Sequence, residues 1–279
     1  MSGSSLSKAR RKKTELMGKR KGFSKAIWFG VLISLGSVAA AAQGLAPGVE
    51  KKTIAAGGAQ QSYYLFVPDH AKKDPPMPLI VLVHGAGGDG LGQIEAWRPL
   101  AEDRRIILLA PNIRNSAADW DQLYDHPEWI RDAIDEVGRK HSVDGRRMYL
   151  WGYSAGCMFS FYFAFLESRY FAAASVHGGV IENFKFQMAD FAIRKVPIAY
   201  YIGTKDQWWT VQQTRATRDA LAARAFPVHY VELNGADHRF FMRSEEITSD
   251  AWKYMKQFAL DRDPQFDALD LGRIKSALK

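Results

Sequence analysis

The pentapeptide Gly152-Tyr153-Ser154-Ala155-Gly156 constrains the fold of this chain more than any other feature. It lies between an apolar run that ends at Trp151 and a second apolar run that begins at Cys157. This pattern predicts a short strand that turns sharply into a helix, with Ser154 at the turn. Such a turn lifts a serine hydroxyl clear of the sheet, where a base can reach it. Ser154 is therefore the predicted nucleophile.

Two polar residues follow later apolar runs in the order that a serine–acid–histidine triad requires on this kind of sheet. Asp206 comes directly after the strand expected at 197–202, and His238 comes after the strand expected at 228–233. Ligand sites of open parallel sheets lie at the carboxyl ends of the strands, so both side chains are expected at one edge. We therefore predict Asp206 as the acid and His238 as the base.

Other residues fit these roles less well. Asp237 adjoins His238, and a sequence neighbour can rarely fold back to hold the outer imidazole nitrogen. His177 also follows an expected strand, but it precedes Asp206 and would break the chain order. Four further histidines are interpreted as surface or packing residues: His70, His126, His141 and His229.

A buried-strand pattern at 79–83 runs into His84-Gly85-Ala86-Gly87-Gly88. Glycines in such a loop let backbone N–H groups approach the position where an oxyanion develops. We predict that Ala86 supplies one N–H donor, with Gly87 as the alternative. The N–H of Ala155, directly after the nucleophile, is the second predicted donor.

Strand and helix patterns alternate through the rest of the chain. Two short apolar runs flanking Gly57-Gly58 predict an N-terminal antiparallel hairpin at the sheet edge. Further strands are expected near 79–83, 106–110, 148–151, 171–176, 197–202 and 228–233, and helices near 92–104, 127–141, 155–167, 210–225 and 244–260. Alternation of this kind predicts an α/β fold with a mostly parallel sheet and helices on both faces. Residues 178–195 break the rhythm and are expected to form either a small cap or, in preference, a helix that covers the sheet.

Because of these motifs, the chain resembles the secreted esterases of the α/β-hydrolase fold over roughly residues 53–258. The similarity lies in the segments 63–68, 78–88 and 203–206, together with the pentapeptide. Within that group it looks most like proteins described as poly(3-hydroxybutyrate) depolymerase-like or feruloyl-esterase-like. The resemblance implies the α/β-hydrolase fold and a triad of Ser154, Asp206 and His238.

Charge and cysteine content exclude several classes of protein. The formal net charge is +8, but residues 1–42 hold nine basic residues and one acidic residue, and the other 29 basic residues are matched by 29 acidic ones. A nucleic-acid partner is therefore not expected. No His/Cys/Asp cluster has metal-ligand spacing, so neither a metal nor another cofactor is predicted. The single cysteine, Cys157, is expected to pack rather than react.

The first 42 residues read as a signal peptide. A basic stretch precedes an uncharged run from Ala26 to Val38, and four alanines follow before Gln43. Met17 would begin a leader of ordinary length. The sequence predicts a linker at 43–50, a hydrolase domain at 51–260 and a surface tail at 261–279. The protein is expected to be exported to the periplasm or outside the cell, with membrane contact only if the leader stays uncleaved.

These features predict a serine carboxylesterase that cleaves a small or oligomeric ester through an acyl-enzyme. Aromatic residues at the expected rim are predicted to contact an aromatic acyl group or a polymer, or else to cover the sheet: Trp120, Tyr153, Trp208, Trp209 and Phe240. The alternatives are a serine exopeptidase of the prolyl-oligopeptidase type and a non-catalytic binding protein on the same scaffold.

The leader assignment makes a direct prediction. The exported protein is expected to begin near Gln43, because Ala42 ends the small-residue stretch that a signal peptidase recognises. Mass spectrometry of the exported protein measures this terminus. An intact leader in the membrane fraction would instead favour an uncleaved anchor.

Overall fold

The computed structural model describes residues 45–268, apart from 57, 70–74 and 113–127. The predicted signal peptide and Trp120 lie outside the described residues. In this part of the chain the strands are β1 (Val49–Ala56), β2 (Ala59–Phe66), β3 (Met77–Val83), β4 (Ile107–Pro111), β5 (Val143–Tyr153), β6 (Ala173–His177), β7 (Ile198–Gly203) and β8 (Val228–Leu233). The helices are α2 (Gly90–Arg104), α3 (Glu128–Lys140), α4 (Ala155–Leu166), α5 (Val211–Ala222) and α6 (Ser244–Met255), with 3₁₀ turns η1 (Asn183–Phe191) and η2 (Phe240–Arg243).

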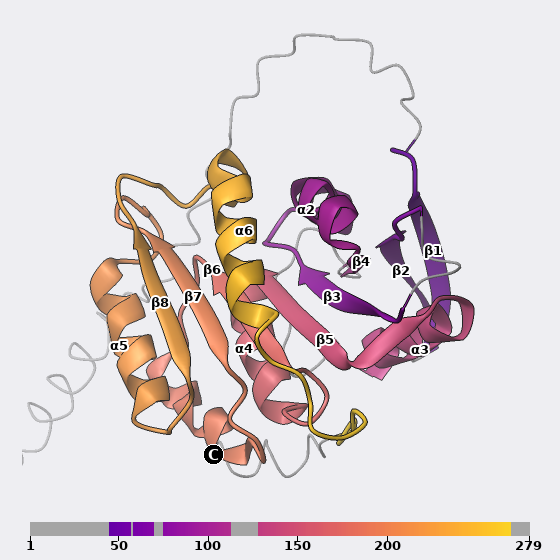
Figure 1. Cartoon of the computed structure of the whole chain (residues 1–279). Helices are drawn as coiled ribbons and strands as arrows, with labels where there is room; N and C mark the ends of the chain where they lie inside the picture. The colour runs from indigo at the N-terminus through magenta and orange to yellow at the C-terminus, as the bar shows by residue number, and fades with distance from the viewer. Residues whose placement is uncertain (1–44, 57, 70–74, 113–127, 269–279) are drawn as a thin grey trace, which may run out of the picture. The chain divides into compact units, whose positions relative to one another are not determined.

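The described strands form one sheet in the order β1-β2-β4-β3-β5-β6-β7-β8. β1 pairs with β2 and β2 with β4 in antiparallel fashion, and the pairs from β4 to β8 are parallel. The expected mostly parallel sheet with an antiparallel N-terminal hairpin is therefore confirmed. This strand order and the helices between the strands are those of the α/β-hydrolase fold (Figure 1).

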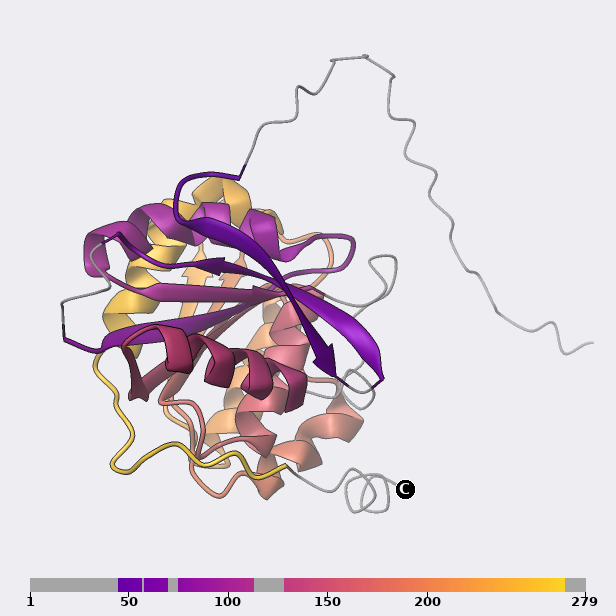
Figure 2. The ribbon, with the colours of Figure 1, turned by 90° about the vertical axis from the view of Figure 1, so that its right-hand side faces the viewer.

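Helices cover both faces of the sheet because alternate side chains of each central strand point to opposite faces. In β3, Leu79, Val81 and Val83 join the apolar cluster that includes residues of α3, α4 and α5. Ile80 and Leu82 join the opposite cluster, which includes residues of α2 and α6. The second view shows α2 and α6 on one side of the sheet and α3 on the other (Figure 2). Burial on both faces explains why these strands read as continuous apolar runs.

Several boundaries differ from the sequence prediction for identifiable reasons. β5 begins at Val143 rather than Met148, because Val143 pairs with Met77 across an irregularity in the β3–β5 register. α6 ends at Met255, where the N–H groups of Gln257 and Phe258 bond carbonyls three residues back and tighten the chain into a turn. The ends of these elements depend on strands and carbonyl groups that the local sequence pattern does not reveal.

Residues 178–195 form no large lid in the described structure. They contain the 3₁₀ helix η1, in which Met188 and Ala189 are buried. Both side chains belong to the apolar cluster that contains α4. The segment is thus a 3₁₀ helix that packs against α4, and the preferred expectation of a helix that covers the sheet is wrong, because the buried side chains meet the helix layer instead.

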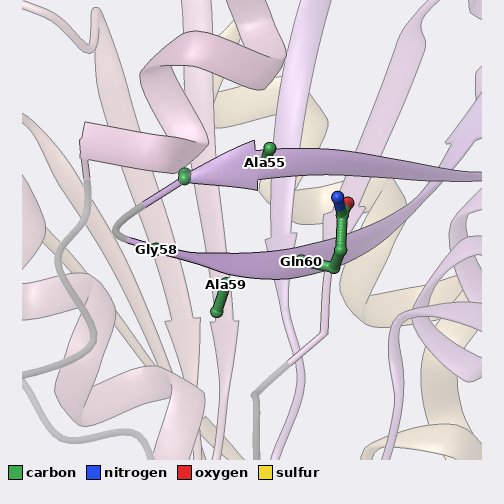
Figure 3. Close-up of a pocket in the computed structure, with 5 residues that line it drawn as sticks. Ala55, Gly58, Ala59 and Gln60 are labelled. Carbon is green, nitrogen blue, oxygen red and sulfur yellow. The ribbon is translucent and has the colours of Figure 1, made fainter.

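The turn between β1 and β2 borders a pocket of about 340 Å³ (Figure 3). Its described lining consists of alanines and a glycine, with Gln60 as the one polar side chain among them. This lining offers little for specific recognition, so we assign no chemistry to it.

The start of α4 lies unusually close to β3. A Cβ atom added at Gly156 would lie 2.3 Å from the carbonyl oxygen of Val83 and 2.5 Å from that of His84. These oxygens belong to backbone and cannot swing away, so a side chain at position 156 would push the helix off the strand. The glycine is therefore a packing requirement of the fold.

Gly156→Ala is expected to destabilise the protein by at least about 2 kcal/mol, a typical cost of overpacking. Gly138→Ala is the matched control, because Gly138 lies in α3 and an added Cβ meets nothing within 4 Å. There, alanine is expected to stabilise the helix by about 0.5–1 kcal/mol. Denaturant unfolding of both variants measures the difference. Equal stabilities would contradict the close contact.

Candidate active site

Ser154, His238 and Asp206 form a continuous hydrogen-bonded chain at the carboxyl edge of the sheet. The Oγ atom of Ser154 lies 2.8 Å from Nε2 of His238. The Nδ1 atom of the same ring lies 2.7 Å from Oδ2 of Asp206. The three residues follow β5, β8 and β7, so parallel strands that end at one edge bring together positions up to 84 residues apart. The structure thus joins the three residues that the sequence predicts for the triad.

The backbone at Ser154 adopts a strained conformation, with φ 56° and ψ −118°. The N–H of Ser154 donates to the carbonyl of His177 at 2.9 Å, and its own carbonyl accepts from the N–H of Cys157 at 2.9 Å. Both sides of the turn are therefore fixed to neighbouring elements. This is the sharp strand-to-helix turn that the pentapeptide predicts, and strain of this kind is common where a side chain must be presented to a substrate.

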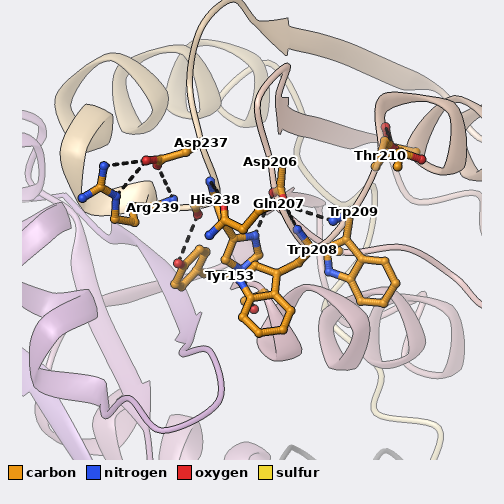
Figure 4. Close-up of polar contacts among 12 residues, drawn as sticks. Tyr153, Asp206, Gln207, Trp208, Trp209, Thr210, Asp237, His238 and Arg239 are labelled. Carbon is orange, nitrogen blue, oxygen red and sulfur yellow. Dashed lines mark hydrogen bonds and ion pairs between the residues drawn. The ribbon is translucent and has the colours of Figure 1, made fainter. Parts of the chain in front are cut away.

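The carboxylate of Asp206 is buried and fully engaged. Besides the His238 bond, its Oδ1 accepts the backbone N–H of Trp208 at 2.8 Å and of Trp209 at 2.9 Å (Figure 4). Burial alone would raise the pKa of Asp206, but the bonds from His238, Trp209 and Trp208 outweigh it and hold the pKa below its ordinary value. Asp206 is therefore ionised at neutral pH.

Asp237, the alternative acid, faces away from the His238 ring. Its carboxylate binds the guanidinium and the N–H of Arg239, with 2.8 Å between Oδ2 and Nε (Figure 4). That pair spans two residues of one exposed loop. Asp237 therefore shapes the loop that carries His238, as its position beside the histidine suggests.

The loop after β3 lies against the serine. A Cβ added at Gly85 would lie 3.0 Å from the Cβ of Ser154, and the next residue, Ala86, is exposed. Ala155 begins α4, and the first N–H groups of a helix have no acceptor within it. Ala155 follows Ser154 in the chain, and Ala86 follows Gly85, which packs against Ser154, so both predicted oxyanion donors lie in segments that border the serine. Their role remains a prediction.

The predicted aromatic rim divides into different environments. Trp208 is 70% exposed, and its ring centroid lies 6.4 Å from that of His238. Trp209 is half-buried beside a pocket. The hydroxyl of Tyr153 donates to the backbone carbonyl of His238, so Tyr153 stabilises the loop that carries this histidine. Phe240 is fully buried against Trp151, so its placement on the rim is wrong, because its ring packs into the core on the α2 and α6 side of the sheet.

Sequence reasoning missed two exposed apolar residues near the site. Phe241 is 50% exposed and lies edge-on to the ring of Tyr153, with 5.7 Å between centroids, and Met242 is 69% exposed. They follow His238 closely, in η2. Their position in the sequence, three and four residues after the predicted base, is the signal that could have placed them near the site.

Cys157 is fully buried, as expected for a packing residue. Burial raises the pKa of its thiol well above the ordinary value, so the reactive thiolate is suppressed. In the part of the chain that the structure describes, no group of three His, Cys, Asp or Glu side chains could hold a metal ion. Nor is any of the described helices long and apolar enough to cross a membrane.

His177 ends β6 and accepts a hydrogen bond from the N–H of Ser154, although its place in the chain order argues against it as the base. Its ring packs against Tyr153 and Phe240, and its Nδ1 atom is buried without a hydrogen-bond partner among the described residues. Burial lowers the pKa of His177 to about 3, and the nearby His238 adds to this lowering. His177 is therefore neutral in the folded protein and places no positive charge beside His238.

This neutral histidine makes stability depend on pH. In the unfolded chain His177 takes up a proton near pH 6.5, whereas the folded protein resists protonation down to about pH 3. Falling pH between these values therefore favours unfolding, by at most about 1.4 kcal/mol per pH unit. His177→Phe, which cannot titrate, is expected to lose less stability than the wild type between pH 7 and pH 5. Denaturant unfolding at both values measures it, with His229→Phe as the control at a half-exposed ring. Identical pH dependence in the wild type and His177→Phe would refute the assignment.

Comparison with known proteins identifies the family to which the chain is related. A sequence profile of the dienelactone hydrolase family matches residues 38–262. A bifunctional acetylxylan esterase/xylanase from Neocallimastix patriciarum is 27% identical over 160 residues, which are 56% of this chain and 23% of that protein. Feruloyl esterase B from Thermothelomyces thermophilus is 29% identical over 130 residues, 42% of this chain and 43% of that enzyme. The chain thus spans less than half the length of either relative.

Solved structures support the fold. A thermostable esterase superposes with a TM-score of 0.62 at 22% identity, over 76% of this chain and 63% of that one. An S-formylglutathione hydrolase from Staphylococcus aureus also gives 0.62, at 17% identity, over 74% of this chain and 98% of its own. At such identities the likeness shows the α/β-hydrolase fold alone, and the similarity to poly(3-hydroxybutyrate) depolymerases stays a prediction.

The family profile covers both the strained serine turn and the loops that carry Asp206 and His238, and the chain therefore belongs to the dienelactone hydrolase family.

Proposed function

We propose that this protein is a serine carboxylesterase that cleaves carboxylic esters through an acyl-enzyme. The observation that carries the proposal is the unbroken hydrogen-bonded chain from Ser154 through His238 to the buried carboxylate of Asp206. A serine hydroxyl is a weak nucleophile until a base accepts its proton, and His238 is within hydrogen-bonding distance to do so. The esterase relatives support the same reaction class.

In the first step, Oγ of Ser154 attacks the ester carbonyl while Nε2 of His238 takes the hydroxyl proton. Asp206, ionised and bonded to Nδ1, holds the ring in the tautomer whose Nε2 is free to accept and stabilises the positive charge that develops. The N–H groups of Ala155 and Ala86 stabilise the oxyanion. His238 then donates its proton to the departing alcohol, and the acyl group remains on Ser154.

In the second step, water attacks the acyl-enzyme. His238 removes a proton from the water, the tetrahedral intermediate collapses, and the acid leaves as Ser154 regains its proton. The neutral state of His177 helps here, because a second cation below His238 would oppose formation of the imidazolium.

Carbohydrate-linked esters are the substrate class that we propose. The named relatives act, by their descriptions, on acetylated xylan or on feruloyl esters. Two exposed aromatic residues near the triad, Trp208 beside His238 and Phe241 beside Tyr153, offer surface to a bulky substrate. An exported enzyme, as the leader predicts, would meet such polymers outside the cell.

The proposed triad predicts a specific ranking of variants. Ser154→Ala is expected to lower kcat for p-nitrophenyl acetate by several orders of magnitude, because triad members act as a unit. Asp206→Asn is expected to lose on the order of 10⁴-fold, since the amide favours the wrong tautomer of His238. Asp237→Asn is the matched control and should lose less than about threefold, because Asp237 binds Arg239 instead of His238.

Steady-state kinetics with equally folded variants measures this ranking. If Ser154→Ala kept more than about a hundredth of the wild-type rate, the proposed nucleophile would be wrong. The reverse order of the two aspartate variants would move the acid to Asp237. Turnover of aminoacyl anilides but not of esters would replace the esterase by the exopeptidase alternative.

A further inference from the structure

A pocket of about 440 Å³ lies between the segment that follows β6 and the first turns of α5. Its size is within the range of small-molecule binding sites in proteins. The described lining comes from three stretches of chain and includes Val180, Ile181 and Glu182 after β6, Trp209 after β7, and Gln212 and Ala216 of α5.

Both walls of this pocket belong to segments that also contact the triad. On one side, the backbone N–H of Trp209 donates to Asp206. On the other side, Val180 comes three residues after His177, whose carbonyl accepts the N–H of Ser154. The segment after β6 also runs past the base, because a Cβ added at Gly178 would lie 3.1 Å from the His238 ring. The pocket is therefore built from segments that hold the triad, and a part of the substrate that does not react can reach it.

Hydrogen bonds hold the two walls in place. The N–H of Ile181 donates to Oγ1 of Thr217 at 3.2 Å, which ties the segment after β6 to α5. The N–H of Thr210 donates to Oε1 of Gln213 at 2.9 Å, and the N–H of Gln213 donates back to the Thr210 hydroxyl at 3.2 Å, which fixes the start of the helix. A pocket with fixed walls loses little entropy when a ligand binds.

The lining combines an indole ring with hydrogen-bonding side chains. Trp209, Val180 and Ile181 offer apolar surface, whereas Gln212, Gln213 and Glu182 carry amide and carboxylate groups. None of the described lining residues is Lys or Arg, and Glu182 is acidic, so a carboxylate- or phosphate-bearing ligand finds no counter-charge. A plain aromatic ring would use the apolar part alone. A ring with an apolar face and several hydroxyl groups uses both parts.

Resting on the proposed esterase function, we infer that this pocket binds a neutral sugar unit of the substrate, with Trp209 against the face of the sugar ring and Gln212 and Gln213 near its hydroxyl groups. Trp208 points elsewhere, since it is exposed and does not line the pocket. The two neighbouring tryptophans therefore have different roles, and Trp209 determines the preference for a sugar-bearing ester.

Filling the pocket tests this inference. Ala216→Phe places a ring into the pocket from an exposed position on α5, and Ala222→Phe is the matched control, exposed on the same helix but not part of the lining. Ala216→Phe is expected to lower kcat/KM for acetylated xylobiose at least tenfold and to change kcat/KM for p-nitrophenyl acetate by less than twofold. Ala222→Phe should change neither. Equal losses on both esters, or no loss in Ala216→Phe, would overturn the assignment.

A binding measurement separates this inference from the proposed function. Ligand-observed NMR with the Ser154→Ala protein and unesterified xylobiose requires no catalysis. Binding is expected in Ser154→Ala and lost when Ala216→Phe is added, and digalacturonate is expected to bind at least fivefold more weakly because it is anionic. If xylobiose binds but wild-type protein cleaves no ester, the esterase proposal fails and the sugar site stands.

Two outcomes refute the sugar site itself: no xylobiose binding to Ser154→Ala, or binding that Ala216→Phe leaves unchanged. Digalacturonate binding as tightly as xylobiose would refute the preference for a neutral sugar. Should Ala216→Phe fail to fold, Gln212→Ala provides a milder variant, since Gln212 is exposed on α5. It is expected to weaken xylobiose binding at least threefold, and unchanged binding would contradict the inference.

Discussion

The site depends on one strained residue, Ser154, whose φ of 56° is a conformation that side chains rarely adopt. Backbone strain of this kind costs on the order of 1–3 kcal/mol, and the fold must offset it. Here the bond from Ser154 N–H to His177 holds the turn against β6, and the start of α4 packs directly on the end of β3. A looser contact would let the serine relax into an ordinary turn, out of line with His238.

The ionised side chain in direct contact with the His238 ring is that of Asp206. Asp206 is the buried carboxylate in contact with the ring, and backbone N–H groups as well as His238 keep it ionised. His177, although close, is neutral. In the proposed mechanism, the imidazolium that develops on His238 is therefore attracted by Asp206 and is not repelled by His177, which favours proton transfer from the Ser154 hydroxyl.

In the function that we propose, the loop after β7 contributes both to catalysis and to substrate binding. The two N–H groups that stabilise the Asp206 carboxylate are backbone groups of Trp208 and Trp209, so the acid's hydrogen bonds also fix the stretch of backbone that carries the two indoles. One indole then lies exposed near His238, and the other lines the pocket beside α5. A substitution that disturbs this loop is thus expected to alter rate and specificity together, whereas a side-chain change in the pocket should affect specificity alone.

The sequence by itself determined the fold class, the identity and order of Ser154, Asp206 and His238, and the packing role of Cys157. These follow from local signals: alternating apolar runs, glycines at a strand-to-helix turn, and polar residues directly after strands. It did not determine where Phe240 lies, that His177 is buried and neutral, or that Val180 and Gln212 share a pocket. Burial, pKa and pocket walls arise from groups far apart in the chain, and parallel strands bring such groups together only when the sheet has formed.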